Sequence, residues 1–102
     1  WELDPRFAGR PSVASHRFAK WREARPHVPE EASLVICGVA TDCCVLGTAV
    51  EAVDDGRHVR LVTDACAAGT PALHEAAITV LRDRAPMLTL TDRARELARL
   101  GV

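Results

Sequence analysis

From residue 33 onward, apolar and polar positions follow two alternating periods. Leu34–Cys37 is a continuous apolar run, which is typical of a strand covered on both faces. Apolar residues then recur at helical spacing from Val45 to Val53, and Gly56 stands where such a helix would end. The run Val59–Thr63 predicts a second strand.

The alternation continues toward the end of the chain. Thr70-Pro71 predicts a helix start, and an apolar stripe from Leu73 to Leu81 predicts the helix itself. Met87–Leu90 predicts a third strand, after which Thr91 is expected to cap a last helix. The apolar positions of that helix are Ala94, Leu97 and Ala98.

Residues 1 to 30 lack such a pattern and are expected to be irregular. They hold four of the six prolines, which limit long helices. A short edge strand over residues 11–15 and a short helix His16–Arg25, ended by Pro26, are the elements predicted here.

Strands that alternate with helices of this length predict parallel βαβ units and therefore an α/β fold. In an open parallel sheet, ligands bind beyond the carboxyl ends of the strands. Cys44 follows the end of the first predicted strand. The hydrophobic periodicity and the position of Cys44 thus indicate the same place for a ligand, the carboxyl edge of the predicted sheet.

Composition narrows the class of protein. The chain has 102 residues, of which 48% are hydrophobic and 26% charged, and this is typical of one globular domain or part of one. A net charge of -1 gives no reason to expect nucleic acid or an anionic membrane as a partner. No apolar run approaches the roughly 20 residues that span a bilayer. Without a secretory signal, the four cysteines are expected to be free thiols in a cytoplasmic protein.

One run of residues carries the candidate chemistry. Cys44 is expected in the first turn of a helix, where unpaired N–H groups and the positive dipole end favour a thiolate. The run Gly38–Val45 (GVATDCCV) resembles the nucleophile turn of the isochorismatase-like cysteine hydrolases, a family that includes nicotinamidases and carbamoylsarcosine amidases. Further similarities, within a resemblance over about residues 12 to 91, are Thr48-Ala49, Gly56–Val59, Val62–Ala65 and His74–Ala77.

The resemblance implies a three-layer, doubly wound, mostly parallel, Rossmann-like sheet. Residues 1–102 would form the C-terminal part of a single hydrolase domain, since the chain starts with Trp1 rather than Met and matches only the second half of that fold. The family's catalytic aspartate would then lie upstream of Trp1. Family members often form dimers or larger assemblies, so a homo-oligomer is expected.

The resemblance also implies a mechanism. Cys44 would attack an amide carbonyl, release ammonia or an amine, and leave a thioester for water to cleave. Backbone N–H groups near Ala40 and Cys44 are expected to bind the oxyanion, and the Val39–Ala40 peptide bond is expected to be cis. Cys43 is the rival thiol. The family's nucleophile stands three residues after Thr and directly before an apolar residue, which Cys44 matches, so Cys43 is assigned to packing.

Three acidic or hydroxyl side chains lie near this end of the predicted sheet. Thr41 and Asp42 are expected to cap the helix start, with orientation of the substrate as the alternative role. Asp64, after the second predicted strand, is expected to be a turn or cap residue.

The lysine of the family's Cys-Lys-Asp set has no single match. Aligning Trp21 with the family's aromatic residue puts Ser15 at the lysine position. Lys20 is the only lysine of the chain, and it fits only if the segment is shifted; otherwise it is a solvated surface charge. His16 is a further candidate for the cation.

No metal and no cofactor are predicted. Some nicotinamidases carry a metal, but its ligands would come mainly from outside this chain. His27, His58 and His74 are not spaced as ligands on one helix face, and no Cys-x-x-Cys run occurs.

The leading hypothesis is a cysteine hydrolase that cleaves a C–N bond of a small-molecule amide through a thioester on Cys44. By the resemblance, the cysteine favours amide hydrolysis, since true isochorismatases lack it. The alternative is a non-catalytic truncated remnant or interaction module of the same fold. A redox sensor formed by Cys43 and Cys44 is a third hypothesis, although adjacent cysteines form a strained disulfide at best.

Overall fold

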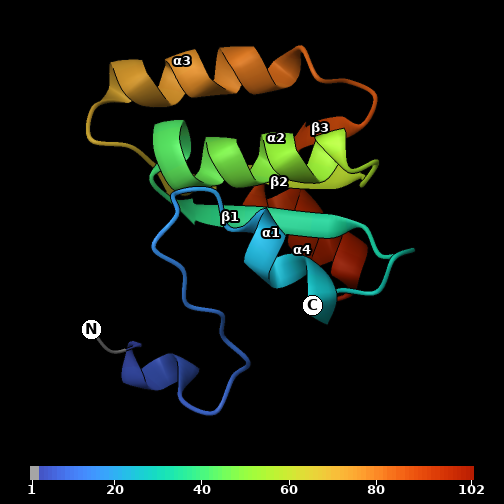
Figure 1. The fold of residues 1–102 in the computed structure, drawn as a ribbon. Coiled ribbons are helices and arrows are strands. Elements are labelled where there is room, and N and C mark those ends of the chain that lie inside the picture. Colours follow the sequence, from blue (N-terminus) through green and yellow to red (C-terminus); the bar gives the residue numbers. More distant parts are fainter. Residues whose placement is uncertain (1–2) are drawn as a thin grey trace.

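A computed structural model describes residues 3–102, so Trp1 lies outside the described residues. Three strands, β1 (Leu34–Val39), β2 (Val59–Ala67) and β3 (Leu88–Thr91), form one sheet in the order β1-β2-β3. Both pairs of neighbours are parallel. The predicted α/β fold with a parallel sheet is therefore confirmed (Figure 1).

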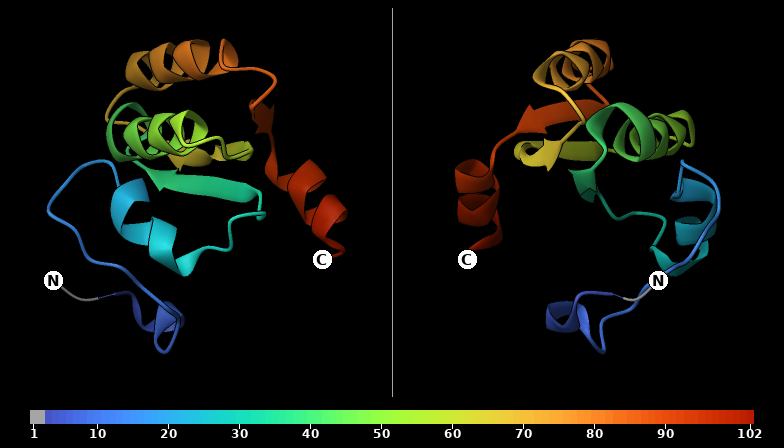
Figure 2. Two further views of the ribbon diagram at one scale, coloured as in Figure 1. Left: turned by 45° about the vertical axis from the view of Figure 1, so that its right-hand side comes forward. Right: turned by 90° about the vertical axis from the view of Figure 1, so that its left-hand side faces the viewer.

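Four α-helices accompany the sheet: α1 (Trp21–Ala24), α2 (Leu46–Asp54), α3 (Pro71–Arg82) and α4 (Arg93–Leu100). The helices α2 and α3 pack on one face, and α4 packs on the other (Figure 2). The remaining helical elements are the short turns Pro5–Phe7 and Arg25–His27 and a π-helical turn, Thr41–Val45.

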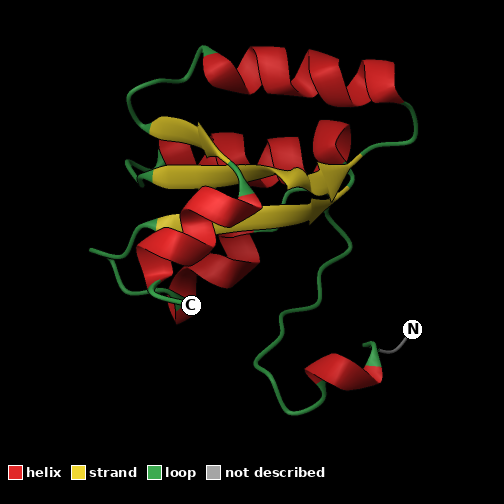
Figure 3. Ribbon diagram, turned by 180° about the vertical axis from the view of Figure 1, so that it is seen from behind, coloured by secondary structure: helices red, strands yellow, loops and turns green. Residues whose placement is uncertain are grey.

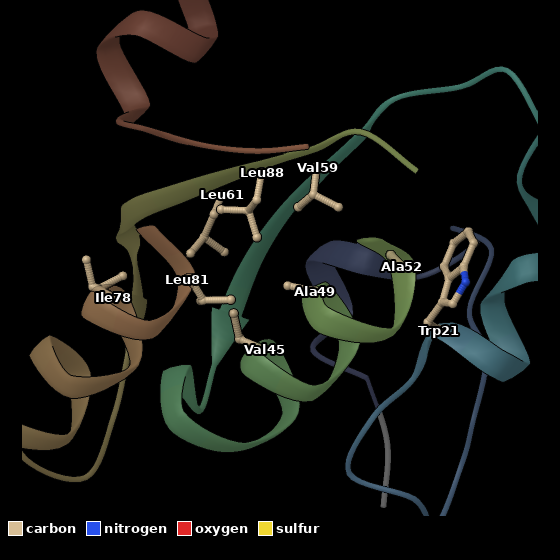
Figure 4. Close-up of a cluster of buried hydrophobic side chains, with 9 residues drawn as sticks. All are labelled: Trp21, Val45, Ala49, Ala52, Val59, Leu61, Ile78, Leu81 and Leu88. Carbon is tan, nitrogen blue, oxygen red and sulfur yellow. The ribbon is translucent and has the colours of Figure 1, made fainter. Parts of the chain in front are cut away.

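The apolar core lies between the sheet and the α2/α3 layer. Leu61 and Leu81 are fully buried at its centre, and the small side chain of Ala49 lets α2 approach the strands closely (Figure 4). The buried members of this cluster are Trp21, Val45, Ala49, Ala52, Val59, Leu61, Ile78, Leu81 and Leu88.

The opposite face is joined to α4 by charge. Side chains alternate along β2, so Arg60 points away from the apolar core. Its Nε donates to Oε2 of the buried Glu96 at 2.9 Å, and Arg99 donates to the same carboxylate. The bonds from Arg99 and then Arg60 hold the pKa of Glu96 below its ordinary value. The predicted apolar side of this helix is therefore wrong, because Glu96 is buried and Leu97 is 48% exposed.

The prediction that the first strand is covered on both faces is also wrong. β1 is an edge strand, and its burial alternates. Leu34 and Ile36 are half-buried against the core, whereas Val35 and Val39 are 41% and 70% exposed. No helix of the described residues covers this second face of β1 (Figure 2).

Local signals located most element ends. Gly56 follows α2 with a φ of 82°, in the left-handed region that glycine tolerates, and Thr70 caps α3 as predicted. Two predictions need correction. β2 continues to Ala67, beyond its expected end, and Asp92 caps the last helix in place of Thr91 by accepting from the Arg95 N–H at 2.8 Å.

The first 30 residues contain short helical turns but no strand within the described part, so the predicted edge strand over residues 11–15 is wrong. The predicted helix starts only at Trp21, and Pro26 lies inside the turn that follows it. Before α1 the chain runs away from the body of the molecule (Figure 3). At the start of α1, Trp21 anchors the chain to the body of the molecule, because its buried indole donates from Nε1 to Asp55 Oδ2 at 2.7 Å.

No helix within residues 3–102 has both the length and the apolar character needed to cross a membrane.

Candidate active site

Cys44 lies at the carboxyl end of β1, in the π-helical turn Thr41–Val45, which we call the cysteine turn. This turn leads directly into α2, so the predicted strand, turn and helix are present in the predicted order. The side chain of Cys44 is half-buried. All four cysteines of the chain are free thiols.

Backbone geometry shapes the entry to the cysteine turn. Gly38 has a φ of 124°, a conformation that L side chains rarely adopt. The Val39–Ala40 peptide bond is cis, which is the geometry that the resemblance implies. The carbonyl of Ala40 accepts from the N–H groups of Cys43 and Val45 at 3.0 and 3.2 Å. Ala40 thereby closes the turn that carries Cys44.

The expectation that Thr41 or Asp42 caps the helix start is wrong. Ala40 occupies the cap position, and no side chain accepts a hydrogen bond there. Thr41 is instead the first residue of the turn; it is completely buried, and its Oγ1 lies 2.8 Å from Nδ1 of His74. Asp42 lies in the first turn, where a carboxylate interacts favourably with the helix dipole.

Cys43 is half-buried beside an apolar groove of about 510 Å³ between α2, α3 and residue 19. Desolvation and the neighbouring Cys44 and Asp42 raise the pKa of the Cys43 thiol, and Lys20 partly opposes them. A raised pKa lowers the fraction of reactive thiolate. This agrees with the assignment of Cys43 to packing.

Lys20 lies beside α2, and its backbone N–H donates to Thr48 Oγ1 at 2.9 Å. The ammonium group donates to the carbonyls of Ser15, at 2.8 Å, and Arg17. Its charge acts on Cys43, whose pKa it lowers. Lys20 is half-buried, and its ammonium group is bonded to backbone carbonyls. Its alternative description as a solvated surface charge is therefore wrong.

Ser15 and His16, the other two candidates for the lysine position, line a cavity of about 640 Å³ together with Lys20 and residues 13 and 14. Ser15 Oγ accepts from the N–H of Arg17 at 3.0 Å, so this hydroxyl closes a local turn. The structure thus gathers all three candidates around one cavity.

Asp64 lies inside β2 and not after it, which corrects its predicted place. Its carboxylate accepts from the backbone N–H of Arg93 at 2.8 Å and from Nε of the same residue at 3.2 Å. Desolvation raises the pKa of Asp64, but the bonds from Arg93 outweigh it and leave that pKa lowered. Asp64 therefore supports the start of α4.

Metal binding finds no support in the donor set. Among residues 3–102, no group of three or more His, Cys, Asp or Glu side chains is placed to hold a metal ion. His27 and His58 are exposed, and His74 is bonded to Thr41. These residues do not fit a metal site.

The parallel sheet with a thiol at the start of the following helix defines an α/β protein with a candidate cysteine nucleophile. The family model described as Isochorismatase domain matches residues 11–94. The chain belongs to this family of hydrolases.

Individual relatives agree with the family. The chain is 31% identical over 65 residues to isochorismatase domain-containing protein 2 of Xenopus laevis, covering 64% of this chain and 32% of that protein. It spans about a third of the length of the curated relatives that it matches.

Two solved structures extend the comparison. Nicotinamidase/pyrazinamidase PncA from Bacillus subtilis is 25% identical, with a TM-score of 0.63 over 76% of this chain and 44% of that one. An isochorismatase family protein from Desulfovibrio vulgaris shares the fold with a TM-score of 0.73 at 24% identity, over 93% of this chain and 51% of that one.

Proposed function

We propose that the protein is a cysteine hydrolase that cleaves the C–N bond of a small amide through a thioester on Cys44. The observation that carries this proposal is the half-buried thiol at the start of a helix, at the carboxyl edge of a parallel sheet. Similarity to a nicotinamidase supports the amide as the substrate class.

In this mechanism the Cys44 thiolate attacks the carbonyl carbon, and a C–S bond forms as the carbonyl oxygen takes up negative charge. Backbone N–H groups near Ala40 and Cys44 stabilise that oxyanion. The C–N bond then breaks, and the leaving nitrogen takes a proton from the catalytic acid that the resemblance implies. Water hydrolyses the thioester, which releases the carboxylic acid and restores the thiol.

Lys20 is proposed as the cation that supports this site. Its electrostatic effect on Cys43, the residue next to the proposed nucleophile, favours this role. Ser15 and His16 remain alternatives, because they line the same cavity.

The function is tested by replacing each of the two adjacent cysteines in the full-length protein. With nicotinamide as the probe, Cys44→Ala is expected to reduce turnover by at least about 10⁴-fold, as loss of a nucleophile does in other hydrolases. The matched control Cys43→Ala is expected to stay within about threefold of the parent. Mass spectrometry of acid-quenched samples is expected to detect an acyl group on Cys44. Turnover that survives Cys44→Ala would rule out the thioester route.

A non-catalytic interaction module of the same fold is the second candidate. The observation that favours it is that the Lys20 ammonium is bonded to two backbone carbonyls. Under this alternative, nicotinamide is not turned over and no acyl group forms on Cys44. An acylated Cys44 favours the hydrolase.

The setting of the protein is also a proposal. Four free thiols favour a reducing compartment such as the cytoplasm. Exposed apolar side chains on the edge strand β1, Val35 and Val39, favour association into a homo-oligomer. Cell fractionation tests the first point, and light scattering tests the second.

A further inference from the structure

Among residues 3–102, the hydroxyl of Thr41 has a single hydrogen-bond partner. Thr41 is 0% exposed, so water does not reach its Oγ1. A buried hydroxyl without a hydrogen bond is costly, and here the bond joins Oγ1 to Nδ1 of His74 at 2.8 Å. Thr41 belongs to the cysteine turn and His74 to α3, so the bond links these two elements through residues that are 33 positions apart in sequence.

Thr41 is tied to the rest of the cysteine turn through its backbone. Its carbonyl accepts from the N–H of Leu46, the first residue of α2. A displacement of Thr41 therefore passes to Cys44, which lies between them. Within residues 3–102, the bond to His74 is the hydrogen bond that connects a side chain of this turn to another helix.

His74 is held on a well-anchored helix turn. The Thr70 carbonyl accepts from the His74 N–H, and Thr70 Oγ1 accepts from the Leu73 N–H, both at 3.2 Å. Farther along the same helix, Ile78 and Leu81 are buried in the core (Figure 4). The imidazole therefore has a fixed base, which a positioning group needs.

We propose that His74 is a positioning residue for the cysteine turn: its bond to Thr41 fixes the backbone that orients the Cys44 thiol. The consequence for catalysis rests on the proposed function. The orientation of the thiol, in contrast, is measured without substrate. Positioning of this kind matters because an error of about 1 Å at a reacting group is enough to slow a reaction about 10²-fold.

The test is the alkylation rate of Cys44 in the full chain with iodoacetamide at pH 8, resolved from Cys43 by tandem mass spectrometry. Thr41→Val and His74→Leu each remove the bond, and each is expected to change the rate by about tenfold. Thr41→Ser and His74→Asn keep a polar atom near its place and are expected to stay within about threefold of the parent. The double variant Thr41→Val/His74→Leu is expected to match the single variants, because both remove one interaction.

His58→Leu is the matched control, since His58 is exposed just before the amino end of β2. If Thr41→Val and His74→Leu lower the melting temperature but leave the Cys44 rate unchanged, the bond is merely structural and the proposal is overturned. Should these two variants fail to fold, His74→Gln is used instead, because its amide reaches past the position of Nδ1. An unchanged alkylation rate of Cys44 in His74→Gln also overturns the proposal. Amide turnover by Cys44→Ala defeats the proposed function alone, because the alkylation result still decides the role of His74.

Discussion

The cysteine turn and the segment Ser15–Trp21, which we call the lysine segment, both lie beside α2 but are held in different ways. The cysteine turn is closed by its own chain, through the Ala40 carbonyl and the helix that follows. The lysine segment is held from a distance: Lys20 bonds to Thr48, 28 residues away, and Trp21 bonds to Asp55, 34 residues away.

This difference separates two kinds of information in the sequence. A turn that satisfies its own backbone is specified by a short run of residues, because the partners are neighbours in the chain. The lysine segment has no regular structure before Trp21, so its place depends on the surface of α2. One position shows how close that fit is: a Cβ at Gly47 would lie 3.1 Å from the Cβ of Ala19.

The largest effect is expected where the lysine segment is anchored. Trp21 is 3% exposed, and the Arg57 guanidinium stacks 4.9 Å from the centroid of its ring. Trp21→Ala is therefore expected to lower the free energy of unfolding by about 3–5 kcal/mol, as in other buried sites. Urea denaturation measures this loss. The control Phe18→Ala removes a side chain that is 72% exposed and is expected to cost less than about 0.5 kcal/mol. A loss below about 1 kcal/mol for Trp21→Ala would mean that other contacts anchor the segment.

The outcome for the fold follows the same division. The starts and ends marked by Gly56 and Thr70 were predictable, because each depends on residues within the same turn. The coverage of β1 was not, since it depends on whether another element packs on its second face. The inward side of α4 was also missed, because an ion pair with Arg60 buries Glu96 where an apolar residue is the usual choice.

The candidate site divides in the same way. The place of Cys44 at a strand-to-helix turn followed from the local run of residues. The partner of Thr41 did not, because helical periodicity assigns His74 to a face of α3 but does not say what packs against that face. The burial of Thr41, which calls for a polar partner, was itself not predicted from the sequence.

An intermediate effect is expected from the charge of the lysine segment. Lys20→Met frees the carbonyls of Ser15 and Arg17 and removes the positive charge near the cysteine turn. Amide turnover by the full-length protein is expected to fall about tenfold, which corresponds to roughly 1.4 kcal/mol. Lys20→Arg keeps the charge, and its amide turnover is expected to lie between that of Lys20→Met and that of the parent. Arg22→Met, an exposed neighbour on α1, serves as the control. If Lys20→Met turns over the amide as fast as the parent, the charge of the lysine segment does not contribute to catalysis at the cysteine turn.

The smallest effect tests whether the charges of the two regions act on a common group. The pKa of Cys43 is raised above its ordinary value by desolvation first, then by Cys44 and Asp42, whereas Lys20 lowers it. A raised pKa means less thiolate at any pH below it, so alkylation of Cys43 at pH 8 is expected to be slower than that of a free cysteine. Lys20→Met is expected to slow it further, and Asp42→Asn to accelerate it, each by about two- to threefold.

These opposite signs make the pair its own control, because general loosening of the turn would accelerate both variants. Rates followed from pH 7 to 10 by tandem mass spectrometry separate a change in pKa from a change in access. A shift of the midpoint in opposite directions indicates that Lys20 and Asp42 act on Cys43 through charge. Midpoints that stay fixed in both variants would mean that desolvation alone sets the pKa of Cys43, and that the lysine segment touches the cysteine turn only through packing.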